Sequence, residues 1–488
     1  MTVEKERKMT LGRMIAYGSG DIFGGGTATA VAALYTLFLT TVAGVEPLTV
    51  GMIFLVVKVM SAVINPIVGY VSDRTRSRWG RRRVYFLLGC VPFFALPWIM
   101  YPFGSPSMKA VWYGGTFILY NICWSLVSIP YFSILADMTA DYGERSKATG
   151  IRMVFSKIGT LVGTWLPLTI IGLFAVKERG YLVMGLAVGA VFALPWLTCF
   201  LFTWERSDVV IPKPGRLGSE LANLYRNFIS TLRNSSFRRH LVMYLGAMTT
   251  FDIFMAVFIM AVTISMGRPL AFARDVLVTV QICQFAGLPI ATWLCIRFSN
   301  SAAFIVSAVS FALSAVAFSL MPADAPFAHM AAVGFFAGSG IAGTVMSSWN
   351  NLPFIADVDE IITRKRREGI YAGFQSFIRQ LSQGLAMLLT NLTLAGIGFV
   401  AGSGGQPEGA RRGILTFLMI APPVILSIGI LGAALYRVNK KNYDILMAEI
   451  SRLRVGGSKE DVGPETKNVV ESLTGIRYEK LWRSDLVD

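Results

Sequence analysis

Residues 48–83 read LTVGMIFLVVKVMSAVINPIVGYVSDRTRSRWGRRR. The first part, residues 48–71, is an apolar run in which Lys58 is the one charged residue. About 20 mostly apolar residues are enough for a helix to cross a bilayer. Six arginines follow between residues 74 and 83. Because arginine-rich loops stay on the cytoplasmic side, this stretch predicts a membrane-spanning helix that ends at the cytoplasm.

The remainder of the chain repeats this pattern of apolar runs and short polar connections. With 54% hydrophobic residues, 15% charged residues and a mean hydropathy of +0.57, it has too few polar side chains to cover a soluble globule. We therefore predict an all-α membrane protein with twelve transmembrane helices. The predicted spans are residues 14–42, 48–71, 84–102, 109–135, 150–175, 180–203, 240–266, 275–297, 302–321, 326–354, 370–399 and 413–436.

The formal net charge of +16 would also suit a nucleic-acid-binding protein, but its distribution argues against one. Basic residues gather in alternate connections, whereas the connections at 41–47 and 322–327 are nearly free of lysine and arginine. This alternation predicts that both termini are cytoplasmic and that the partner of the basic loops is the lipid bilayer, not nucleic acid. The basic clusters lie at residues 74–83, 145–152, 205–239, 364–367 and 437–441.

The longest internal connection, residues 205–239, follows the sixth predicted span and contains Pro212 and Pro214. It divides the chain into an N-terminal six-helix bundle, residues 1–204, and a C-terminal one, residues 240–436. Residues 437–488 are polar, and we expect a cytoplasmic tail with one short helix near 442–453.

Five cysteines and two histidines are scattered without paired spacing, so we expect neither a disulfide framework nor a metal site. No nucleophile, base and orienting group occur together at a recognisable spacing, and we expect neither an enzyme nor a cofactor. The first residues, MTVEKERKMTLGRM, lack the apolar core of a cleaved signal peptide, so the first helix is expected to direct insertion.

The two halves show a weak internal echo at the ends of the fourth and tenth spans. Each end has a proline, an Ala-Asp pair, and then a glutamate beside an arginine. Carboxylates that pair with arginines at a cytoplasmic hinge would explain the echo, and ordinary loop charges at a membrane surface are the alternative. The candidate gate or hinge residues are Asp73, Arg74, Asp137, Arg145, Asp357 and Arg367.

Several strings resemble the glycoside-pentoside-hexuronide:cation symporter family of the major facilitator superfamily, to which melibiose permeases belong. The resemblance covers nearly all of residues 14–436. It implies a major-facilitator fold, in which two six-helix bundles rock around a site near the bilayer midplane, and transport of sugars with sodium, lithium or a proton. The strings are Tyr17 to Asp21, Asn65 to Gly80, Ile129 to Tyr131, Gly143 to Arg145 and Arg366 to Gly373.

The chain departs from the family at positions that carry carboxylates in sodium-coupled members. Ser61, Asn65 and Ser128 align with carboxylates of the second and fourth spans, and Gly25 aligns with a sugar-binding aspartate. Neutral oxygens alone would bind sodium weakly, so we predict sodium-independent transport. Asp21 and Asp252, in the first helix of each half, are candidates for a coupling proton, and the alternative is no coupling.

Charged residues inside a span mark function by default, because burial of an unpaired charge is costly. Arg152 and Arg379 align with family positions that contact sugar or are functionally important, and a neutralising ion pair is the alternative for each. Gly24, Gly25 and Gly26 are expected to allow close helix packing. The candidate substrate-binding residues are Arg379, Arg152, Lys157, Lys58, the aromatic Phe132 and Trp349, and Gly25 and Ser128.

We predict a secondary active transporter that moves a sugar or glycoside by alternating access, and the cationic residues suggest an anionic, uronide-like substrate. One alternative is a carrier of lysolipids or other amphipathic anions, and another is a membrane sensor without transport. We expect a monomer in the bacterial inner membrane.

Overall fold

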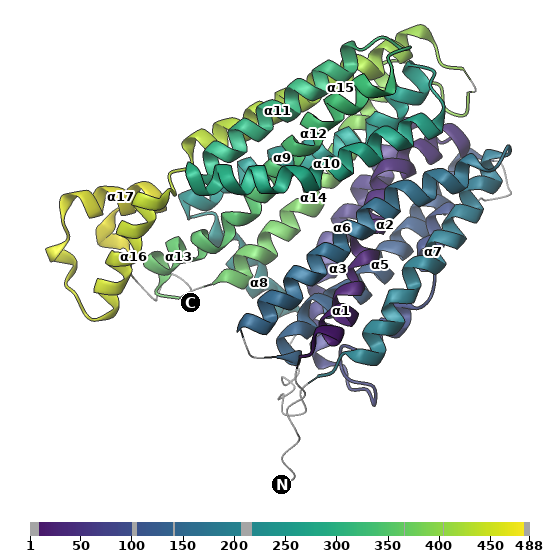
Figure 1. Ribbon diagram of the computed structural model, residues 1–488. Helices are drawn as coiled ribbons and strands as arrows, with labels where there is room; N and C mark the ends of the chain where they lie inside the picture. The colour runs from purple at the N-terminus through teal and green to yellow at the C-terminus, as the bar shows by residue number, and fades with distance from the viewer. Residues whose placement is uncertain are drawn as a thin grey trace. The chain divides into compact units, whose positions relative to one another are not determined.

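The computed structural model describes residues 9–99, 105–139, 142–205, 217–365, 367–403 and 405–482 (Figure 1). The regular elements of these residues are all helical. The longer helices are α1 (Leu11–Ser19), α2 (Asp21–Leu37), α3 (Pro47–Arg74), α4 (Val84–Gly89), α5 (Pro106–Met138), α6 (Tyr142–Gly172), α7 (Lys177–Phe202), α8 (Leu217–Thr231), α9 (Ser235–Met260), α10 (Leu270–Arg297), α11 (Asn300–Leu320), α12 (Phe327–Asn350), α13 (Leu352–Thr363), α14 (Glu368–Gly396), α15 (Glu408–Leu435), α16 (Lys440–Arg454) and α17 (Pro464–Thr474).

The chain forms two compact units. Helices α9, α10, α14 and α15 contribute residues to both units. The predicted division into residues 1–204 and 240–436 stays a prediction. The first unit consists of residues 1–215, 255–278 and 387–414, and the second of residues 216–254, 279–386 and 415–488.

Within the described residues, ten helical stretches are long and apolar enough to cross a membrane, which confirms the prediction of an all-α membrane protein. The other two predicted spans are α14, whose apolar face is interrupted by polar side chains, and the third span, residues 84–102. The third span is not one continuous helix. It contains α4 and a 3₁₀ segment, Phe93–Trp98, because Pro92 and Pro97 cannot donate the backbone hydrogen bonds of an α-helix.

In the first unit, helices α2 and α6 cross with their backbones in close contact. A Cβ atom added at Gly159 would overlap the carbonyl oxygen of Ile22, and one at Gly25 would overlap that of Ser156. At Gly26 the obstacle is the ring of Phe192. The expectation of close packing is therefore confirmed for Gly25 and Gly26, because only a residue without a side chain fits there.

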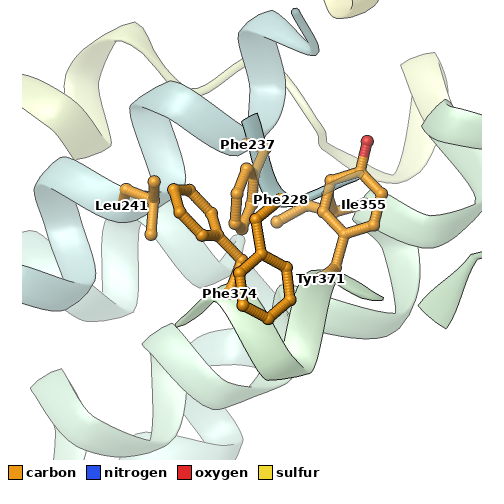
Figure 2. Packing of buried hydrophobic residues seen from close by; sticks show 6 residues of the cluster. All are labelled: Phe228, Phe237, Leu241, Ile355, Tyr371 and Phe374. Carbon is orange, nitrogen blue, oxygen red and sulfur yellow. The ribbon is translucent and has the colours of Figure 1, made fainter. Parts of the chain in front are cut away.

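In the second unit, the connection predicted at residues 205–239 contains helix α8, which packs on the unit through its apolar face. Figure 2 shows Phe228 of α8 among buried side chains of α9, α13 and α14. This cluster lies at one end of α14 and holds the start of that helix against α8. Its members are Phe228, Phe237, Leu241, Ile355, Tyr371 and Phe374.

The tail folds onto the second unit. Helix α16 confirms the helix expected near residues 442–453, whereas α17 was not predicted. The hydroxyl of Ser236 on α9 donates to the carbonyl oxygen of Leu473 at 2.7 Å, and the Trp482 N–H donates to that of Ile361 on α13 at 2.8 Å. These contacts fix the tail on the ends of α9 and α13.

Candidate functional site

A two-pronged ion pair joins Asp252 on α9 to Arg379 on α14 in the second unit. The distances are 2.6 Å from Nη1 to Oδ2 and 2.8 Å from Nη2 to Oδ1, and the Asp252 side chain is only 1% exposed. Parallel bonds of this kind are among the stronger hydrogen bonds in proteins. Arg379 is thus neutralised by Asp252, as the alternative interpretation of the sequence allowed.

The Asp252–Arg379 pair belongs to a polar row on one face of α14. Arg367, Tyr371, Gln375, Arg379 and Gln383 follow one another at four-residue spacing, which places them along one side of a helix. These residues bond to buried groups of α9, of the turn before it and of α13, so the row faces the interior of the second unit. The partners include His240, whose Nε2 lies 2.8 Å from Gln375 Oε1, as well as Asn234 and Asp359.

A looser ion pair joins Asp21, the first residue of α2, to Arg152 on α6 in the first unit. The Nε to Oδ2 distance is 3.8 Å, too long for a hydrogen bond. The guanidinium lies 4.9 Å from the ring centroid of Phe132, a side chain that is 45% exposed. The predicted residues Asp21, Arg152 and Phe132 therefore come together.

Lys157 lies just over one turn beyond Arg152 on α6 and is half-buried. Among the described residues it makes neither a hydrogen bond nor an ion pair. An ammonium group without a counter-charge is unfavourable inside a membrane, so this side chain can attract an anion. Lys58, the other predicted lysine, is half-buried on α3.

Ser61 and Asn65 on α3 and Ser128 on α5 are neutral residues at positions where sodium-coupled family members carry carboxylates. Ser61 Oγ donates to the carbonyl oxygen of Val57 at 2.9 Å, and Ser125 Oγ donates to Asn65 Oδ1 at 2.7 Å. The Ser128 hydroxyl is buried and has no hydrogen-bond partner in the described part of the chain. Over that same part, no group of three or more His, Cys, Asp or Glu could hold a metal ion.

Two predicted substrate contacts remain, Trp349 in the second unit and Gly25 in the first. Trp349 on α12 is 48% exposed, and its ring meets Tyr244 edge-on at 5.7 Å. Gly25 packs against the backbone of α6, as described above. Contact of either residue with substrate stays a prediction.

The predicted hinge residues Asp73 and Asp137 bind arginines of the loop after α3. Asp73 Oδ1 accepts from Arg82 Nη2 at 2.6 Å, and Asp137 Oδ2 accepts from Arg81 Nη2 and Arg82 Nη1 at 2.8 Å each. Glu205 accepts from the backbone N–H groups of Arg81, Arg82 and Arg83. Sequence reasoning missed Glu205, although it is the first charged residue after the sixth span.

Three further hinge candidates have different surroundings. The guanidinium of Arg74 lies 3.6 Å from the ring centroid of Tyr70. Asp357 accepts a hydrogen bond of 2.8 Å from Tyr443 of the tail. The side chain of Arg145 lies outside the described part of the structure.

Arg367, the last hinge candidate, pairs with Asp359. Its Nε and Nη2 each lie 2.7 Å from an Asp359 oxygen, and Tyr371 also donates to Oδ1 at 2.7 Å. Burial by itself would lower the pKa of Arg367, but the bonds and charge of Asp359 outweigh it and raise that pKa. Sequence reasoning singled out Asp357 because it follows Ala356 in the echo, and nothing local distinguishes the carboxylate two residues later.

Comparison with known proteins gives a consistent result. A family model described as MFS/sugar transport protein matches residues 16–440. The putative glycoside/cation symporter YagG of Escherichia coli is 24% identical over 92% of this chain and 96% of its own. The sodium-dependent lysophosphatidylcholine symporter 1-B of Danio rerio is 21% identical over 85% of this chain and 84% of its own.

Among solved structures, a bacterial homologue of the human lysosomal transporter Spinster, in an inward-facing conformation, has a similar fold. The TM-score is 0.60 at 13% identity, and the match covers 87% of this chain and 96% of the other. At this identity the likeness concerns the fold alone.

Proposed function

Because the chain belongs to the MFS/sugar transport protein family, we propose that it is a secondary active transporter of an anionic, uronide-like sugar or glycoside. The family and the relatives are membrane transporters, and some of them carry sugars or glycosides by name. The negative charge of the substrate and the independence from sodium are our own additions.

The observation that carries the proposal is the state of Lys157. Arg152 has Asp21 and Arg379 has Asp252, whereas Lys157 has no counter-charge among the described residues. A substrate carboxylate would supply the missing negative charge and remove the cost of a half-buried ammonium. Neutral sugars offer no such gain, so the site favours a sugar acid.

The loose Asp21–Arg152 contact supports the same assignment. A pair held at 3.8 Å without a hydrogen bond loses little when Arg152 turns to a substrate carboxylate. Phe132 offers an aromatic face beside that arginine, and aromatic faces pack against the apolar face of a sugar ring. The Arg379 guanidinium, by contrast, must first leave Asp252.

The test is uptake into proteoliposomes of methyl glucuronide, with methyl glucoside as the matched neutral sugar. The Lys157→Gln variant should lose at least tenfold in glucuronide uptake, because about 1.4 kcal/mol of binding corresponds to a factor of ten. The exposed Lys147 on the same helix provides the control, and Lys147→Gln should behave as the parent. Equal glucuronide uptake by the parent and Lys157→Gln would contradict the assignment.

Sodium independence is the second part of the proposal. Ser61 and Asn65 offer only neutral oxygens where sodium-coupled family members carry carboxylates, and neutral oxygens compete poorly with water for sodium. Uptake into vesicles should therefore not change when sodium is replaced by choline. An imposed pH gradient tests proton coupling, with Asp21→Asn and Asp252→Asn as variants. A strong, saturable sodium requirement at constant pH would show this part to be wrong.

A second candidate function is transport of lysophospholipids. The observation in its favour is the Danio rerio relative, a lysophosphatidylcholine symporter by name. A phosphate group would also suit Lys157. Competition separates the two candidates, because lysophosphatidylcholine should inhibit glucuronide uptake only if it enters the same site.

The orientation in the membrane is also a proposal. The arginine clusters place both termini in the cytoplasm, and we propose a bacterial inner membrane as the location.

A further inference from the structure

A small cavity lies in the second unit where α8, α13, the start of α14 and the tail come together. Its volume is about 110 Å³, and one water takes up roughly 30 Å³ in the liquid. It therefore has room for a tetrahedral oxyanion. The residues that line it include Ser230, Arg233, Asn234, Asp359, Arg367 and Lys480.

The charges around this cavity do not balance. Asp359 accepts two bonds from Arg367 and one from Tyr371, so its negative charge is already matched. Arg233 and Lys480 also line the cavity, and their side chains make no hydrogen bond or ion pair within the described ranges. Both side chains are exposed at the edge of the cavity, so two positive charges are available to a ligand there.

The neutral polar groups of the cavity are already in use. Ser230 Oγ accepts from Arg367 Nη1 at 2.8 Å and donates to the carbonyl oxygen of Asn227 at 2.7 Å. The Asn234 amide lies within 3.4 Å of the Ile355 carbonyl oxygen and the Tyr371 hydroxyl. Recognition would therefore come mainly from the cations, which favours a small anion over a neutral solute.

The walls of the cavity are fixed from two sides. Figure 2 shows that the Tyr371 oxygen points away from the other labelled side chains, and this hydroxyl donates to Asp359 Oδ1 at 2.7 Å. The tail contributes Ile476 and Lys480, and Trp482, two residues beyond Lys480, is bonded to α13. The backbone of these walls is therefore held in place before binding, whereas the exposed side chains of Arg233 and Lys480 become ordered when the ligand enters.

We propose that this cavity binds a small phosphate-bearing anion, which links the tail to α8 and to the Asp359–Arg367 pair. Arg233 supplies a planar fork suited to phosphate oxygens, and Lys480 supplies a point charge from the tail. The phosphate could belong to a soluble compound or to a lipid head group. The cavity is built from residues of the second unit and does not include Lys157, so the inference does not depend on the transported substrate.

The test uses the full chain in phosphatidylcholine nanodiscs, with inorganic phosphate as the probe and chloride at equal ionic strength as the reference. Calorimetry should show saturable phosphate binding and a matching rise in melting temperature. The double variant Arg233→Gln/Lys480→Gln should bind phosphate at least tenfold more weakly. The matched control is Arg226→Gln/Arg477→Gln, two other exposed cations, one on α8 and one in the tail near Lys480, that do not line the cavity.

Two further measurements identify the source of the phosphate and check that the variants are folded. Nanodiscs with phosphatidylglycerol should weaken phosphate binding if a lipid head group occupies the cavity, and should leave it unchanged if the ligand is soluble. Both double variants should elute and melt like the parent in chloride. The proposal is overturned if the parent shows no saturable phosphate binding, or if Arg233→Gln/Lys480→Gln binds phosphate as the parent does.

Discussion

Two aspartate–arginine pairs lie within the predicted spans, one in each unit, and they differ in geometry although their residue types are the same. Asp252 and Arg379 meet through two short bonds, and the carboxylate is almost fully enclosed. Asp21 and Arg152 approach only to 3.8 Å, and their side chains are 12% and 21% exposed. The first pair is therefore part of the packing, whereas the second can exchange its partner.

The surroundings of each pair explain this difference. Asp252 faces the polar row of α14, where Gln383 lies 3.5 Å from the same carboxylate. Asp21 lies inside the helical stretch Leu11–Val42, just after the junction of α1 and α2, and Arg152 approaches it only to 3.8 Å. Arg152 in turn stacks on Phe132. A guanidinium with a second contact of this kind depends less on the carboxylate.

The largest effect is expected from Arg379→Ala, which leaves Asp252 as a buried and unpaired carboxylate. Removal of one partner from such a pair costs about 3 to 5 kcal/mol of folding free energy. The melting temperature of the purified protein should fall clearly, and uptake should be lost. If Arg379→Ala melts and transports like the parent, the pair is not the support described here.

A double variant provides the control for this experiment. Asp252→Asn/Arg379→Gln removes both charges, so it should recover most of the lost melting temperature. If it also recovers uptake, then Arg379 acts only in folding.

A smaller effect is expected from Gly159→Ala at the α2–α6 crossing, which sets the position of Asp21 relative to Arg152. The new methyl group would overlap the carbonyl oxygen of Ile22 and push the helices apart, at about 1 to 3 kcal/mol. Gly150 on the same helix has open space at this position, so Gly150→Ala should not lower the melting temperature. Equal melting temperatures for the two variants would argue against a tight crossing.

The smallest effect on stability is expected from Asp21→Asn. A pair without a hydrogen bond contributes about 1 kcal/mol or less, and the amide retains an acceptor oxygen. Thermal melts of Asp21→Asn and Asp252→Asn in parallel compare the two pairs directly. If Asp21→Asn destabilises as much as Asp252→Asn, the distinction between a fixed and an exchangeable pair is wrong.

Residues of the site could be predicted from the sequence where the signal lies in the residue and its neighbours, but not where it depends on contacts between distant segments. Lys157, Arg152 and Arg379 stood out because each is a charge in an apolar run, and that signal is local. The partner of Arg367 did not, since Asp357 and Asp359 are both acidic residues near the end of the tenth predicted span. Which of them meets Arg367 depends on how α13 turns relative to the start of α14.

The amino-acid sequence by itself determined that the chain is an all-α membrane protein with charges buried in its spans. Hydrophobicity and charge are properties of each residue, so the membrane spans and the charges within them can be recognised from the order of residues alone. Only the tertiary structure decided that Arg379 is held by Asp252 while Lys157 has no partner among the described residues, and that the tail closes a cationic cavity with Arg233 and Arg367. Distances of a few ångströms between helices far apart in the sequence settle such pairings, and the spacing within one helix carries no information about them.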